Sequence, residues 1–134
     1  MATVKGGCLC GAVRYSFEGE PAAAMVCHCT HCQKQSGSAF STILGVPEGA
    51  LEVSGETRTF GDSGESGQSV ERIFCPCCGS PLISKVAVAP GMLFIKAGTL
   101  DDTANFAPSM HIWARSKQCW VDTQGLPSFD TNPG

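Results

Sequence analysis

Cys75-Pro76-Cys77-Cys78-Gly79 is the stretch of this sequence that most constrains its fold. A Cys-x-x-Cys pair followed by glycine is typical of a zinc knuckle, in which two thiolates leave one tight turn and the glycine accepts the positive φ that follows. Cys8 and Cys10 stand two residues apart just before an expected strand, so in an extended chain both side chains project from one face. These two thiolates and those of Cys75 and Cys78 have the composition of a closed, structural, tetrahedral zinc site.

A second cluster, Cys27-His28-Cys29-Thr30-His31-Cys32, supplies three more thiolates and has no obvious fourth partner. Three protein ligands leave one position on zinc open, which a catalytic site keeps for water or substrate. The alternative is a second structural site that the protein itself completes. The candidates for that fourth ligand are His28, His31, His111 and Cys119.

The clustering of the nine cysteines favours metal binding over a disulfide framework. Disulfides join cysteines from distant segments with Cα atoms about 5.5 Å apart, and cysteines that are close together in one cluster are poorly placed to pair with each other. We expect Cys77 to point away from the ion and to be a small buried residue, and Cys119 to be a packed thiol.

The 134 residues have room for one domain, which we expect to span 1–134. The net charge is −3 and no stretch gathers the basic residues into a stripe, which argues against nucleic acid as a partner. The N-terminus has no apolar run of a secretion signal, and no run of 18 apolar residues occurs anywhere. We therefore expect a cytoplasmic protein that does not cross a membrane.

Sixteen glycines and eight prolines punctuate the chain at short intervals, which favours a mainly β fold of short strands. Val13, Tyr15 and Phe17 alternate with smaller or polar residues, the period of a strand with one buried face. Short helical turns are expected near residues 30–35 and 100–103. Strands are expected close to residues 12–17, 40–46, 51–53, 57–60, 70–74, 82–86, 92–97 and 110–113.

Three segments together resemble the glutathione-dependent formaldehyde-activating enzyme family, also called the GFA or CENP-V domain. They are Gly7-Cys8-Leu9-Cys10-Gly11, the Cys27-His28-Cys29-x-x-Cys32 run leading into Ser36-Gly37-Ser38-Ala39-Phe40, and Phe74-Cys75-x-x-Cys78-Gly79-Ser80. The resemblance extends to His111-Ile112-Trp113 and Lys117-x-x-Trp120. It implies a zinc-stabilised β fold of the Mss4-like type, with small sheets and few helical turns.

The resemblance also implies two zinc ions per chain, and this agrees with the spacing of the cysteines. A structural zinc is expected on Cys8, Cys10, Cys75 and Cys78, and a catalytic zinc on Cys27, Cys29 and Cys32. The family's founding activity is the condensation of formaldehyde with glutathione, classed in reverse as a carbon-sulfur lyase.

The leading functional hypothesis is therefore a zinc-dependent carbon-sulfur lyase acting on a small-molecule thiol and a small carbonyl compound. A thiol would enter the open zinc position, lose its proton and add to the carbonyl carbon. The candidate acid or orienting groups are His28, His31 and His111. One alternative is a non-enzymatic zinc module whose second site binds a thiol or a protein partner, and another is redox sensing by Cys27, Cys29 and Cys32.

Overall fold

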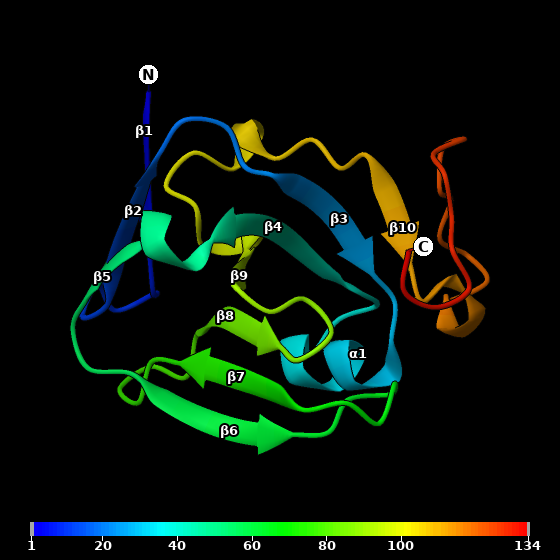
Figure 1. Ribbon diagram of the computed structural model, residues 1–134, viewed down its shortest axis with the longest axis horizontal. Coiled ribbons are helices and arrows are strands. Elements are labelled where there is room, and N and C mark those ends of the chain that lie inside the picture. Colours follow the sequence, from blue (N-terminus) through cyan, green and yellow to red (C-terminus); the bar gives the residue numbers. More distant parts are fainter. Residues whose placement is uncertain (1, 134) are drawn as a thin grey trace.

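Short strands make up most of the structure, a computed structural model that describes residues 2–133 (Figure 1). The helical segments are α1 (Thr30–Ser36) and the 3₁₀ turns η1 (Glu48–Ala50), η2 (Ala97–Thr99), η3 (Thr103–Asn105) and η4 (Ala114–Ser116). The strands are β1 (Thr3–Gly7), β2 (Arg14–Glu18), β3 (Ala23–Cys27), β4 (Ser41–Pro47), β5 (Glu52–Ser54), β6 (Arg58–Asp62), β7 (Val70–Phe74), β8 (Pro81–Val86), β9 (Met92–Lys96) and β10 (Met110–Ile112). The predicted mainly β class is confirmed.

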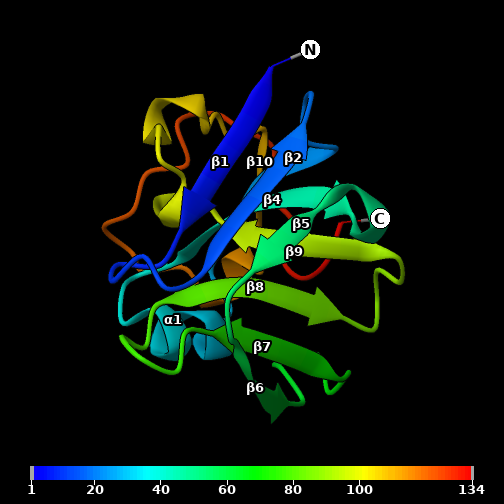
Figure 2. The ribbon, with the colours of Figure 1, turned by 90° about the vertical axis from the view of Figure 1, so that its left-hand side faces the viewer.

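The strands form two sheets. A three-stranded antiparallel sheet has the order β1-β2-β5, and a seven-stranded sheet has the order β10-β3-β4-β9-β8-β7-β6. The only parallel strand pair described within residues 2–133 joins β10 to β3. Figure 2 shows the small sheet lying across one face of the large one.

The main core lies between the two sheets. Tyr15 and Phe17 of β2 point into it, and Leu44 of β4 and Ile95 of β9 face them from the large sheet. Leu44 and Ile95 are directly paired in the register of β4 and β9. Since side chains alternate along a strand, their neighbours Ile43, Phe94 and Lys96 point to the opposite face. The large sheet thus carries a different set of side chains on each side.

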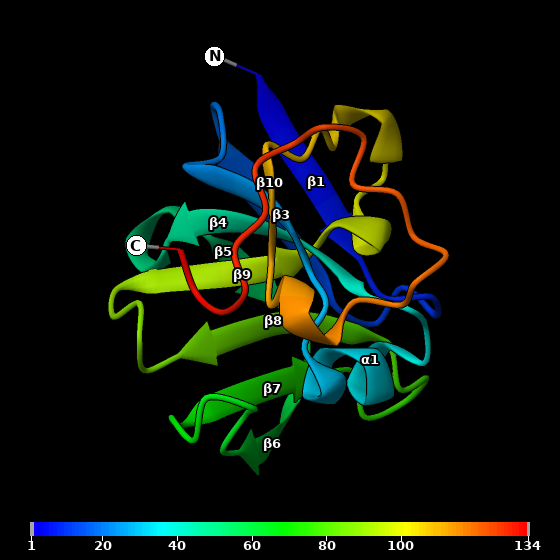
Figure 3. The same ribbon diagram turned by 90° about the vertical axis from the view of Figure 1, so that its right-hand side faces the viewer.

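The opposite face of the large sheet holds a second, smaller hydrophobic cluster. Met25, Ile43, Phe94 and Ile112 belong to it, together with the three cysteines of residues 27–32. Helix α1 and the C-terminal segment lie on this side of the molecule, away from β1 and β2 (Figures 1 and 3). One face therefore builds the main core, and the other holds the second cysteine cluster.

Most strand predictions agree with the structure to within a few residues, but two strands were not predicted. Strand β3 lies inside the sheet between β10 and β4, so its apolar run shows no alternation of the kind that marks a half-buried strand. Strand β1 ends in two glycines, which have low strand propensity. The predicted turn at 30–35 is α1, whereas in the predicted turn at 100–103 only Thr103, the first residue of η3, is helical, and residues 100–102 lie between η2 and η3. Within residues 2–133 no helix has the length and apolar character needed to cross a membrane.

Gly55, in the turn between β5 and β6, is expected to tolerate no side chain. Its φ is +98°, and an added Cβ would collide with the carbonyl oxygen of Ala12. Gly55→Ala should therefore lower the free energy of unfolding in urea by about 1–3 kcal/mol. Gly49→Ala is the matched control, because its Cβ would meet no atom within 4 Å, and it should change stability by less than about 0.5 kcal/mol. Equal losses in the two variants would contradict this view of the turn.

Candidate metal centres

The first group of four cysteines comes from two hairpin turns that belong to different sheets. Cys8 and Cys10 lie in the turn between β1 and β2, whereas Cys75 and Cys78 lie in the turn between β7 and β8. Their four sulfurs lie within 4.8 Å of one another. The knuckle glycine, Gly79, has the predicted positive φ, at 78°.

The spacing of these sulfurs fits a tetrahedral zinc ion. With zinc-sulfur bonds of about 2.3 Å, the sulfurs of a tetrahedral site are about 3.8 Å apart. The structure gives 3.6 Å between the sulfurs of Cys8 and Cys10, and 3.8 Å between those of Cys10 and Cys75. This group could therefore hold a metal ion without rearrangement.

Hydrogen bonds support the sulfurs of this group from the surrounding turns. The amide of Val13 donates to Cys8 Sγ at 3.2 Å, and the amide of Cys77 donates to Cys75 Sγ at 3.4 Å. Ser80 Oγ lies 3.2 Å from Cys78 Sγ and accepts a hydrogen bond from the amide of Leu9 across the junction. Hydrogen bonds from Ser80 lower the pKa of the Cys78 thiol to about 5, which favours the thiolate that a metal binds.

The second group, Cys27, Cys29 and Cys32, lies where β3 runs into α1. Cys27 is the last residue of β3, Cys29 caps the N-terminus of α1 and Cys32 is in the first turn of that helix. The amide of Cys32 donates to Cys29 Sγ at 3.2 Å, and the sulfurs of Cys27 and Cys32 are 3.4 Å apart. All three residues are buried, and their sulfurs lie within 4.8 Å of one another. Within residues 2–133, no fourth histidine, cysteine or carboxylate joins this group.

The three buried thiols compete for protons. Hydrogen bonds from Cys27 and then Cys29 lower the pKa of Cys32 to about 2. The pKa of Cys27 is raised by its hydrogen bonds to Cys29 and Cys32 and by burial. Several thiolates this close together need a cation, and a soft divalent metal such as zinc suits three sulfur ligands.

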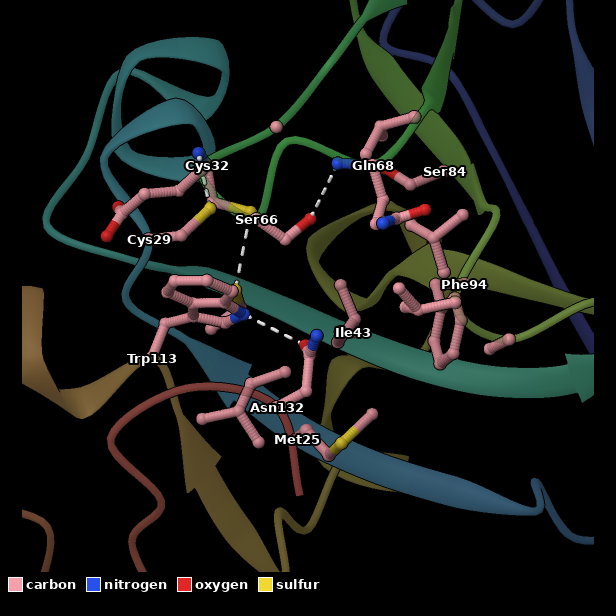
Figure 4. Close-up of a pocket in the computed structure, with 18 of the residues that line it drawn as sticks. Met25, Cys29, Cys32, Ile43, Ser66, Gln68, Ser84, Phe94, Trp113 and Asn132 are labelled. Carbon is pink, nitrogen blue, oxygen red and sulfur yellow. Dashed lines mark hydrogen bonds between the residues drawn. The ribbon is translucent and has the colours of Figure 1, made fainter. Parts of the chain in front are cut away.

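A cavity of about 330 Å³ opens beside this second group. Cys27, Cys29 and Cys32 line it, whereas none of the four cysteines of the first group does. Figure 4 shows Cys29 and Cys32 at the cavity with Ile43, Phe94 and Trp113 around it. The Nε1 of Trp113 donates to Asn132 Oδ1 at 2.9 Å, so the C-terminal segment forms part of the wall.

Two buried cations, Arg72 of β7 and Lys96 of β9, also line the cavity. Arg72 Nη1 lies 4.0 Å from Cys32 Sγ, and its Nε donates to Asp62 at 2.9 Å. Burial opposes ionisation of Asp62, but hydrogen bonds from His31 and Arg72 outweigh it and hold the pKa of this carboxyl at about 2. Burial lowers the pKa of Lys96, and the nearby Cys32 thiolate opposes that effect. The cavity therefore combines sulfur anions with fixed positive charge.

The three histidines proposed from sequence lie near the second group, but none of them lines the cavity. His28 is completely buried, and its Nε2 shares a hydrogen bond of 2.8 Å with Nδ1 of His111. Burial, and then the charge of His111, lower the pKa of His28 to about 4, so this histidine is neutral near pH 7. His31 Nδ1 contacts Asp62 at 2.9 Å, and His31 reaches the cavity only through Asp62 and Arg72.

The glycine-rich loop between β6 and β7 covers one side of the cavity, where Gly64, Glu65, Ser66 and Gln68 line it. Glu65 holds this loop in place. Its carboxylate accepts hydrogen bonds from the amide and hydroxyl of Thr30, from Ser116 Oγ and from Arg115 Nε. One carboxylate thus joins the loop to α1 and to η4.

Two sequence expectations about cysteines were wrong, and several cavity residues were not predicted. Cys77 and Cys119 are exposed, not packed. Cys77 sits at the tip of a hairpin turn, where a side chain that points away from the metal group reaches solvent. Arg72, Ser84 and Lys96 reach the cavity through the pairing of distant strands. A usable signal existed for Arg72, which stands two residues from both Val70 and Phe74 on an apolar strand face.

Comparisons with known proteins identify the family of this fold and site. The model of the family described as glutathione-dependent formaldehyde-activating enzyme matches residues 3–116. The chain belongs to this family. Among the curated proteins, none matches it. A crystal structure of a Rhodobacter sphaeroides protein is similar, with a TM-score of 0.59 and 19% identity over 93% of this chain and 98% of that one, and it supports the fold.

Removing the charge of Glu65 is expected to loosen the loop over the cavity. Glu65→Gln keeps the shape but loses one acceptor oxygen and the charge, so the free energy of unfolding in urea should fall by about 1–3 kcal/mol. Glu71→Gln is the matched control, because Glu71 is exposed on β7, and it should change stability by less than about 0.5 kcal/mol. An unchanged stability of Glu65→Gln would contradict the role given to this carboxylate.

Proposed function

We propose that this protein is a zinc-dependent carbon-sulfur lyase that adds a thiol to a small aldehyde, or catalyses the reverse reaction. The observation that carries the proposal is the contrast between the two cysteine groups. Four cysteines form a set complete for tetrahedral zinc, whereas the other three line a cavity of about 330 Å³. The family's description supports glutathione and formaldehyde as the first substrates to test.

Two zinc ions per chain fit the donor sets. Cys8, Cys10, Cys75 and Cys78 would hold a structural ion, and Cys27, Cys29 and Cys32 would hold a catalytic one. When bound by three thiolates, zinc supplies a position at which a substrate thiol becomes a thiolate at neutral pH.

The protein's own residues prepare this cavity for an anionic substrate sulfur. Two buried cations, Arg72 and Lys96, offset the negative charge of the cysteine thiolates. The apolar walls at Ile43, Phe94 and Trp113 lower the local dielectric constant, which strengthens these electrostatic interactions. A thiolate in such a setting is desolvated and close to positive charge.

The histidines His28, His31 and His111 stay proposed as proton-handling or orienting groups. Because none of them lines the cavity, each would act through another residue. His31 would act through Asp62 and Arg72, whereas the His28 and His111 pair would orient the strand and helix that carry the cysteines.

The proposed partners are a small-molecule thiol and a small carbonyl compound. We place the activity in the cytoplasm, because the reaction needs reduced thiols on both the protein and the substrate.

Loss of the first cysteine group should unfold the protein, whereas loss of the second should remove only its activity. The first joins segments 65 residues apart, so Cys75→Ser should unfold or aggregate the protein. The second is local, so Cys32→Ser should leave a folded protein with one zinc and no activity. Cys77→Ser, in the same turn as Cys75 but exposed, is the control and should keep both metals. Metal analysis and thermal unfolding measure these outcomes, and equal loss of the thermal transition in Cys75→Ser and Cys32→Ser would contradict the division.

A small thiol should bind at the second group with release of a proton. Zinc binds thiolate, so a thiol that arrives protonated near neutral pH loses its proton on binding. Calorimetry with glutathione in two buffers of different ionisation enthalpy counts the protons. Cobalt in place of zinc reports sulfur ligands by its absorption. Four sulfurs at the second group before any thiol is added would mean that the protein closes the site, which favours a non-enzymatic zinc module.

A further inference from the structure

Arg72 and Ser84 occupy adjacent places on the floor of the cavity beside the second cysteine group. They are directly paired in the register of β7 and β8, so their side chains share one face of the sheet. Ser84 is in turn paired with Phe94 of β9, whose side chain also lines the cavity. Both Arg72 and Ser84 are more than nine-tenths buried.

The hydroxyl of Ser84 is an unused hydrogen-bonding group. Its Oγ is fully buried and has no hydrogen-bond partner among the residues that the structure describes. A buried polar atom without a partner costs stability, and it points to a group that the site normally binds. Figure 4 shows Ser84 at the cavity beside Phe94, its partner in the register of β8 and β9.

Arg72 places a permanent positive charge next to the metal-binding sulfurs. Its Nε donates a hydrogen bond to Asp62. Its Nη1 lies 4.0 Å from Cys32 Sγ, which is longer than a strong hydrogen bond. A guanidinium stays charged at any pH of interest and offers several donors in one plane. Donors of this side chain are therefore available to a group bound beside the cysteines.

We propose that Arg72 and Ser84 together bind the substrate oxygen that becomes negatively charged when a thiol adds to an aldehyde. This inference rests on the proposed function. In the addition, the sulfur electron pair forms the new carbon-sulfur bond and the carbonyl π pair moves onto oxygen. The proton lost by the thiol then returns to that oxygen through water, which gives the hydroxymethyl product. Donors already aimed at the developing charge accelerate such a step.

Arg72 and Ser84 can contact a substrate in the cavity directly, whereas the histidines cannot. None of His28, His31 and His111 lines the cavity, whereas Arg72 and Ser84 do. The competing view is that Arg72 only neutralises the cysteine thiolates. In that case Arg72 would affect every bound thiolate equally, and Ser84 would affect none.

Two small thiols of similar size distinguish these views. Mercaptoacetate carries anionic oxygens close to its sulfur, whereas 2-mercaptoethanol carries a neutral hydroxyl. The measurement is the ratio of their dissociation constants by calorimetry on the zinc-loaded protein. The variants are Ser84→Ala, which removes no existing hydrogen bond, and Arg72→Gln. Arg14→Gln is the matched control for charge, since Arg14 pairs with Asp101 on the surface and does not line the cavity.

We expect the wild type to prefer mercaptoacetate, and Ser84→Ala to reduce that preference about tenfold, as the loss of a hydrogen bond to a charged group predicts. Arg72→Gln should reduce it at least as much, and Arg14→Gln should leave it unchanged. A ratio in Ser84→Ala equal to that of the wild type overturns the inference, whatever Arg72→Gln does. If neither thiol binds the wild type, the second cysteine group has no open position for a thiol, and the inference is then wrong as well.

A second readout separates this inference from the proposed function. With glutathione and formaldehyde, Ser84→Ala should lower kcat about tenfold and leave KM for the thiol unchanged, because the oxygen becomes negative only as the bond forms. A fall in thiol affinity without a change in kcat would overturn the catalytic role. A wild type that binds thiols but does not turn over would contradict the lyase, while the ratio of dissociation constants would still decide whether Arg72 and Ser84 bind an anionic oxygen.

Discussion

The sulfurs of Cys8, Cys10, Cys75 and Cys78 meet where two hairpin turns from two different sheets come together, and the rest of the structure depends on that junction. One metal ion bound by all four sulfurs would fix the position of the small sheet on the large one. The apolar side chains of β2 are buried against β4, β8 and β9. A chain with only 7% aromatic residues gains much from such a cross-link, because its hydrophobic core alone is modest.

The proposed division of labour between the two cysteine groups rests on the alternation of side chains in the large sheet. One face is used for the core under the small sheet. The other carries Arg72, Ser84 and Lys96 toward the three cysteines at the start of α1. A cavity with fixed positive charge therefore forms beside one group of sulfurs, whereas the other group lies between two hairpin turns, with Cys8 and Cys75 buried and Cys10 exposed. The same cysteine chemistry can in this way support stability at one place and reactivity at another.

Local patterns predicted most strands and the cysteine pairs and triplet, because these depend on residues close together in the sequence, and the count of four ligands for zinc joined Cys8 and Cys10 to Cys75 and Cys78. The knuckle around Cys75 and the cluster of residues 27–32 are examples. Strand β3 was missed because its burial on both sides removes the alternation that marks a strand. Ser84 and Lys96 could not be assigned to the site from sequence, because only the pairing of β3, β4, β9 and β8 brings them beside the cysteines. Local sequence spacing therefore cannot identify site residues whose position depends on strand register.

The central claim is that one cysteine group is complete and the other leaves a position for substrate. X-ray absorption at the zinc edge tests it most directly, because it counts the sulfurs around the metal in the folded protein. Before any thiol is added, the account predicts an average of three and a half sulfurs per zinc, four at one site and three at the other. After addition of a thiol substrate the average should rise to four. An average of four sulfurs in the protein alone, unchanged by added thiol, would contradict the account.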